Sequence, residues 1–151
     1  MPLERIAEIA GVGIGTLYRH FPTRGLLAEA VYKSELDELT AGVPDLIDNN
    51  PGLEALHIWL DRYSLLIFAK RAMYDVFRDT LMSHEASSSA TWKRINETLA
   101  TFIAAGIRDA VRSDDLTIAL AGVVAAATFS ADLDQLRRLL AILTTGIRPS
   151  N

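Results

Sequence analysis

Residues 2–24 read PLERIAEIAGVGIGTLYRHFPTR. The first half of this stretch places apolar residues at helical spacing, and Gly11 then provides a residue that adopts a positive φ at little steric cost. A second short apolar pattern follows and ends at Phe21, because Pro22 interrupts it. Two short helices joined at a glycine form a helix-turn-helix pattern, and in such motifs the second helix enters the major groove of DNA.

The two predicted helices each have an apolar face that we expect to point inward. These faces consist of Leu3, Ile6, Ala7 and Ala10 in the first helix and Val12, Leu17 and Phe21 in the second. The remaining positions are small, polar or singly apolar and are expected to face outward. The candidate DNA-binding residues are therefore Gly13, Ile14, Thr16, Tyr18, Arg19, His20 and Arg24.

The outward side chains suit recognition of DNA in chemical terms. The hydroxyls of Thr16 and Tyr18 form hydrogen bonds with phosphates or base edges, and Ile14 suits the methyl group of thymine. Arg19 pairs either with a guanine edge or with a phosphate. We expect His20 and Arg24 to contact phosphates at the far end of the second helix, which would fix its docking angle.

Glycines flank the start of the second helix. Gly13 and Gly15 would let the backbone approach DNA closely, and the N-terminus of a helix favours a phosphate. A phosphate-binding loop for a dinucleotide is the other reading of these glycines. The residue at position 16 is threonine and the preceding segment is helical, so the spacing does not match that motif.

The stretch from Ile6 to Arg24 resembles the DNA-binding signature of the TetR (tetracycline-repressor-like) family of bacterial transcription regulators. The resemblance covers about residues 3–32. It implies that DNA-contact positions are occupied by Thr16, Tyr18, His20 and Arg24. It also implies an all-α homodimer that binds operator DNA and senses a small molecule.

The chain departs from the family pattern in three ways. Gly13 stands where a serine-like cap is usual, and Arg24 stands where lysine is common. Family members also have another helix before residue 3, so we expect a DNA-binding domain that lacks its first helix. Either translation starts upstream of Met1 or the chain has been cut.

Composition excludes several classes of protein. Half of the 151 residues are hydrophobic and 23% are charged, which excludes a disordered tail. No apolar run reaches the roughly 18 residues that a membrane span needs, and no secretory signal begins the chain. The absence of cysteine excludes disulfides and zinc–thiolate sites. We therefore expect a cytoplasmic protein without a membrane partner.

Charge is unevenly distributed along the chain. The formal net charge is −4, of which residues 1–33 carry +1 and the remainder −5. A slightly basic end on an acidic body would bring one end to DNA, but a difference of this size also arises by chance.

Helical spacing of apolar residues continues through the rest of the chain, and strand patterns are nearly missing. We predict about eight helices in an all-α fold. The predicted division is an incomplete helix-turn-helix domain over residues 1–32 and a domain for ligand binding and dimerisation over residues 33–151.

Bulky side chains recur in the central helices of the predicted second domain. They would line a cavity for an apolar or aromatic effector, or they would fill an ordinary core. The candidate ligand-binding residues are Trp59, Tyr63, Ile67, Met73, Phe77, Trp92, Phe102 and Ile103.

The last two predicted helices are rich in alanine and in leucine, respectively. The first has little side-chain bulk and contains Ala119, Ala121, Gly122, Ala125, Ala126 and Ala127; the second carries an apolar ridge from Leu133 to Leu143. Such a pair would bury its apolar surface against the same pair of a second subunit, forming a four-helix interface. In a monomer both helices would instead belong to its own core.

Catalytic and metal-binding patterns are weak. Neither His57 nor His84 has a second histidine or a cysteine one helical turn away, and Asp114 and Asp115 are better explained as the acidic first turn of a helix. The serines at 87–89 match no nucleophile motif. We therefore predict no catalytic residue, no metal and no cofactor. The alternative function is a helical ligand-binding dimer that does not bind DNA by itself, because the first helix is missing.

Overall fold

The computed structural model describes residues 2–70, 90–107, 111–127 and 132–147. The described residues form eight helices and no strand, which confirms the all-α prediction. In chain order they are α1 (Leu3–Ala10), α2 (Ile14–His20), α3 (Arg24–Ala41), α4 (Val43–Asn49), α5 (Gly52–Lys70), α7 (Ala90–Ala104), α8 (Ser113–Ala127) and α9 (Leu133–Thr145).

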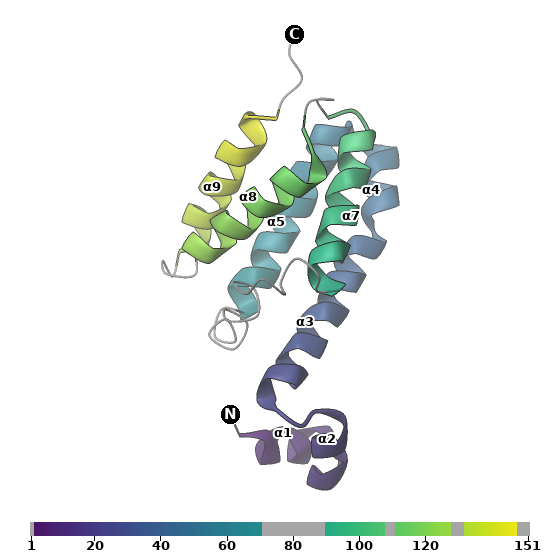
Figure 1. Ribbon diagram of the computed structural model, residues 1–151, viewed down its shortest axis with the longest axis vertical. Coiled ribbons are helices and arrows are strands. Elements are labelled where there is room, and N and C mark those ends of the chain that lie inside the picture. Colours follow the sequence, from purple (N-terminus) through teal and green to yellow (C-terminus); the bar gives the residue numbers. More distant parts are fainter. Residues whose placement is uncertain (1, 71–89, 108–110, 128–131, 148–151) are drawn as a thin grey trace.

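The first two helices form a small unit at one end of the molecule (Figure 1). Its N-terminal core consists of the buried residues Leu3, Ala7 and Leu17, with Ile6, Phe21 and Leu27 packed against them. Three buried side chains make a small core, since each contributes on the order of 1.5–3 kcal/mol at most.

Helix α3 connects this unit to the rest of the molecule (Figure 1). Thr23 caps its first turn by accepting a hydrogen bond from the Leu26 backbone N–H at 3.2 Å. Leu27 packs on the N-terminal core, whereas Tyr32 and Leu36 belong to the larger core. Helix α3 therefore enters both cores; the predicted domain boundary between residues 32 and 33 stays a prediction.

The larger core is built around α5, which packs against α3, α4, α7 and α9. Its fully buried apolar side chains are Leu36, Ala55, Leu56, Trp59, Leu99, Phe102 and Leu120. Gly52 at the start of α5 lies against the end of α7, where a Cβ would come within 2.6 Å of the Ala105 carbonyl oxygen. Glycine is therefore required for this close approach.

Helices α8 and α9, the last two that the structure describes, lie side by side (Figure 1). Leu116, Leu120 and Leu136 contribute to the larger core. Arg137 of α9 is anchored to α5 by a hydrogen bond from its Nε to Asp61 Oδ1 at 2.7 Å. None of the described helices has the length and hydrophobicity needed to cross a membrane.

Candidate nucleic-acid interface

The turn between α1 and α2 is determined by Gly11. This residue has φ 66° and ψ 26°, the left-handed conformation that glycine adopts without a steric penalty. Its N–H donates to the Glu8 carbonyl at 3.2 Å, and the N–H of Val12 donates to the Ala7 carbonyl at 3.0 Å. These two bonds form a Schellman motif, which ends α1 and turns the chain into α2.

Helix α2 has one buried side chain. Leu17 is 8% exposed, and the residues on either side of it in the helix are exposed. Its first turn begins after Gly13, which makes no side-chain capping bond. The missing cap agrees with the expectation that Gly13 replaces a capping serine.

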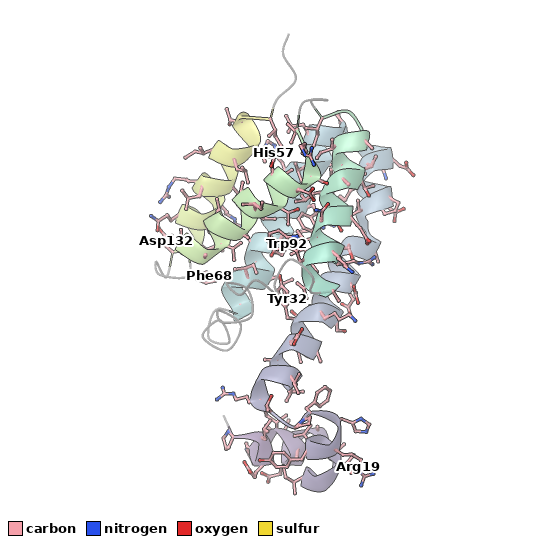
Figure 2. All side chains as sticks on the ribbon, viewed as in Figure 1. Arg19, Tyr32, His57, Phe68, Trp92 and Asp132 are labelled. Atoms are coloured by element: carbon pink, nitrogen blue, oxygen red, sulfur yellow. The ribbon has the colours of Figure 1, made fainter. Side chains whose placement is uncertain are left out.

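All of the candidate DNA-binding side chains lie on the surface. Ile14 is 39% and Tyr18 44% exposed, both large for apolar or aromatic groups. Thr16, Arg19, His20 and Arg24 are also exposed. Figure 2 shows Arg19 at the outer edge of the N-terminal unit, away from the larger body. The structure thus gathers the candidates on the surface of α2 and the first residue of α3; their contacts with DNA stay predictions.

Tyr18 has a protein partner that the sequence pattern did not indicate. Its hydroxyl donates a hydrogen bond to Glu4 Oε1 of α1 at 3.3 Å. The negative charge of Glu4 raises the pKa of the Tyr18 hydroxyl, with smaller contributions from desolvation and from the hydrogen bond itself. The hydroxyl therefore stays protonated, and it must leave Glu4 to donate elsewhere.

Four predicted inward-facing positions are wrong or only partly right. Val12 is 43% exposed because it lies in the turn, where its N–H closes the Schellman motif while its side chain faces solvent. Ala10 is exposed, and Ile6 and Phe21 are only half-buried against the N-terminal core. Ile9 is 66% exposed, so apolar surface of α1 remains uncovered among the described residues.

The candidate ligand-binding residues fall into three groups. Trp59, Tyr63 and Phe102 are buried in the larger core, where Trp59 stacks on Tyr63 with ring centroids 5.1 Å apart. The half-buried members are Ile67, Trp92 and Ile103. Met73 and Phe77 lie outside the described residues. Whether the group binds an effector stays a prediction.

Two hydroxyls add a polar pair inside this aromatic group. Tyr32 of α3 and Tyr63 of α5 are hydrogen-bonded through their hydroxyl oxygens, which are 2.9 Å apart. Burial raises the pKa of Tyr63 to about 12, although the bond to Tyr32 acts in the opposite direction. Burial also raises the pKa of Tyr32 well above its usual value. The pair joins α3 to the larger core in its uncharged form.

The other polar candidates have structural partners. His57 Nε2 bonds with the Thr144 hydroxyl, and Asp114 accepts from the Asn96 amide. Within the described ranges, no group of three or more acidic or histidine side chains is arranged to hold a metal ion. His84 and the serines at 87–89 lie outside the described residues.

No protein-family model matches the chain. The chain is 36% identical over 64 residues to the HTH-type transcriptional regulator SAR0097 of Staphylococcus aureus, a match that covers 40% of this chain and 34% of that protein. The chain thus spans about a third of the length of this curated relative.

A solved structure matches nearly the whole chain. The TetR transcriptional regulator SCO0520 from Streptomyces coelicolor aligns with a TM-score of 0.71 and 37% sequence identity, over 99% of this chain and 89% of that chain. Both relatives are described as regulators of transcription, and the second has the same fold from end to end of the alignment. The chain therefore belongs to the TetR family of transcription regulators.

Proposed function

We propose that the protein is a dimeric repressor that binds operator DNA through α2 and leaves it when a small-molecule effector binds. The observation that supports this proposal is the exposure of Thr16, Tyr18 and Arg19 on a helix whose one buried side chain is Leu17. Polar groups on an exposed helix of a helix-turn-helix are placed for base and phosphate contacts. Such a regulator acts in the cytoplasm, where bacterial DNA lies.

DNA binding is tested by fluorescence anisotropy with a duplex that the protein selects from a random pool. Thr16→Ala is expected to weaken binding about tenfold, in line with about 1–3 kcal/mol for a specific base contact. Thr101→Ala is the matched control, because Thr101 is an exposed threonine of α7, in the larger body. Equal affinities of the two variants would contradict the assignment.

Dimerisation is proposed through α8 and α9. Ile118 of α8 is 60% exposed and Ile142 of α9 is 71% exposed, so both present an apolar side chain to solvent in the single chain. Ala121 and Gly122 beside them are exposed and small, which permits close approach of a second helix pair. A two-fold dimer would place its recognition helices to read half-sites about 34–36 Å apart.

Analytical ultracentrifugation tests this interface. Ile142→Asp is expected to give a folded monomer, because a buried unpaired carboxylate is costly at an interface. Leu65→Asp is the control, since Leu65 is 45% exposed on α5, outside the α8–α9 pair. A dimer that survives the Ile142 change, or that is lost in both variants, would contradict the proposal.

The effector is proposed to bind among the aromatic side chains of the larger core. In the described part of the chain, the Trp59 Nε1–H is buried without a hydrogen-bond partner. Such a donor costs about 1–3 kcal/mol until an acceptor satisfies it. An apolar or aromatic molecule with one acceptor oxygen would supply that partner, and its preference for one dimer geometry would shift operator affinity.

A thermal-shift screen of aromatic compounds tests this site. Compounds that bind the folded state raise the melting temperature, and at a fixed concentration the shift grows with the logarithm of their affinity. Trp59→Phe retains an aromatic ring and removes the donor, so it is expected to reduce the shifts of acceptor-bearing compounds more than those of hydrocarbons. Equal reductions for both classes would contradict the role of Nε1.

A second candidate function is a ligand-binding dimer without autonomous DNA binding. Exposed Ile9, Val12 and Leu26 favour it, because they leave apolar surface on a unit whose own core is small. Under this function the anisotropy titration shows no saturable, salt-dependent binding, while dimerisation and thermal shifts remain.

A further inference from the structure

A groove lies between α3 and the start of α7, apart from the aromatic group. It has a volume of about 390 Å³, within the range of small-molecule sites. Its lining residues are Lys33, Leu36, Asp37, Ala90, Thr91 and Arg94. Those of α3 share one helical face, as do those of α7, so both helices present a continuous wall.

The floor of the groove is buried and the rim is charged. Leu36 is fully buried and Thr91 is 8% exposed. The Arg94 and Asp37 side chains are 44% and 46% exposed, respectively. Lys33 is exposed on the same rim. A ligand in the groove would therefore meet Ala90 and Thr91 at the start of α7 and charges at the edge.

Only part of the positive charge on the rim is neutralised. Arg94 uses its Nε atom twice, for Asp37 Oδ1 at 3.2 Å and for the Thr40 hydroxyl at 3.1 Å. Among the residues that the structure describes, no ion pair involves the Lys33 ammonium, and the stated contacts of Arg94 are made through Nε. Two cations and one carboxylate give the groove a net charge of +1.

We propose that this groove binds a small amphipathic monoanion, a carboxylic acid with an apolar body. The carboxylate would pair with the terminal amino groups of Arg94 and with Lys33, since guanidinium and carboxylate form charge-assisted hydrogen bonds. The apolar body would cover Ala90, which is exposed at the start of α7. A single negative charge balances the rim, and the carboxylate of Asp37 disfavours a ligand of higher charge.

The groove lies on the helix that leads to the DNA-binding end, so a bound ligand could affect that end through α3. Arg24, at the start of α3, lies about 14 Å along the helix from Lys33 at 1.5 Å per residue. A ligand that bridges α3 and α7 would restrict movement of α3 relative to the larger body. This consequence for operator affinity rests on the proposed function; the binding site itself does not.

Isothermal titration calorimetry of the full chain tests the site, with benzoate as the probe and benzamide as its uncharged analogue. Benzoate is expected to bind saturably and about tenfold more tightly than benzamide, because only benzoate has the paired charge. Inorganic phosphate, which lacks an apolar body, is expected to bind more weakly than benzoate. Equal binding of benzoate and benzamide, or no saturable benzoate binding, overturns the proposal.

Variants locate the binding. Lys33→Gln leaves the Arg94–Asp37 pair intact and is expected to weaken benzoate binding about fivefold. Arg112→Gln removes an exposed cation that does not line the groove. The affinity of this variant for benzoate is expected to stay unchanged. Asp37→Asn is expected to strengthen binding about threefold by removing the like charge, a sign that a merely structural role would not give. Weaker binding by Asp37→Asn, or an equal loss in Arg112→Gln, overturns the site.

Titration with the operator duplex distinguishes benzoate binding at the groove from an effect of that binding on DNA affinity. Benzoate binding that alters duplex affinity supports coupling through α3. Benzoate binding with unchanged duplex affinity overturns the coupling and leaves the site, whereas a chain that binds benzoate but no DNA overturns the proposed function alone.

Discussion

Two glycines of the N-terminal unit are expected to respond in opposite ways to the same substitution. Gly11 has a positive φ of 66°, whereas Gly15 lies inside α2. A Cβ at either position would meet no atom within 4 Å, so neighbouring atoms do not oppose the change. Any difference in stability between Gly11→Ala and Gly15→Ala therefore reflects the backbone conformations of the two residues.

The magnitudes follow from the two backbone conformations. Alanine in the left-handed region costs about 1–2 kcal/mol, and the lower entropy of the unfolded chain offsets part of it. Gly11→Ala is expected to destabilise the unit by about 1 kcal/mol. Gly15→Ala is expected to stabilise it by about 0.5 kcal/mol, since glycine is unfavourable within a helix.

Amide hydrogen exchange measures the local effect. The Leu17 N–H, bonded to the Gly13 carbonyl at 3.1 Å, reports opening of α2. Its exchange is expected to accelerate about fivefold in Gly11→Ala and to slow about twofold in Gly15→Ala. Amides of α5 serve as the control and are expected not to change. Acceleration in both variants, or in neither, would refute the reasoning from φ.

Three further predictions concern hydroxyl groups. A double-mutant cycle of Tyr32→Phe and Tyr63→Phe, followed by urea unfolding, is expected to give a coupling of about 1 kcal/mol; additive effects would contradict a direct bond. Both tyrosines have raised pKa values in the folded state. Their contribution to the free energy of unfolding is therefore complete below pH 10 and declines toward about pH 12, where Tyr63 ionises. A Tyr63→Phe variant whose free energy of unfolding falls with alkaline pH as steeply as that of the wild type would contradict this. Glu4→Gln is expected to raise DNA affinity about threefold by freeing Tyr18 and removing a negative charge, and an equal gain in the Glu8→Gln control would show a general charge effect.

The helix pattern was accessible from the sequence because it depends on local chemistry. The apolar spacing, the turn at Gly11 and the cap at Thr23 each determine structure within a few residues. The burial of Leu17 and the exposure of Tyr18 follow from their positions on one short helix. Apolar spacing predicts an inward Val12, because spacing alone does not show that this residue belongs to the turn.

Contacts between helices were not accessible in the same way. The Glu4–Tyr18 bond joins α1 to α2 across the turn, and the Arg94 bonds to Asp37 and Thr40 join residues more than 50 positions apart. These pairings depend on how helices cross, which periodicity does not specify. The aromatic set was recognised by type, but the sequence could not decide between a core and a cavity.

Amide hydrogen exchange with and without the selected duplex tests the central claim most directly. If α2 enters the groove of DNA, protection on duplex binding is predicted to concentrate in residues 14–20 and at the start of α3, with α8 and α9 unchanged. Protection elsewhere in the chain, with exchange of α2 unaffected at saturating duplex, would contradict the account.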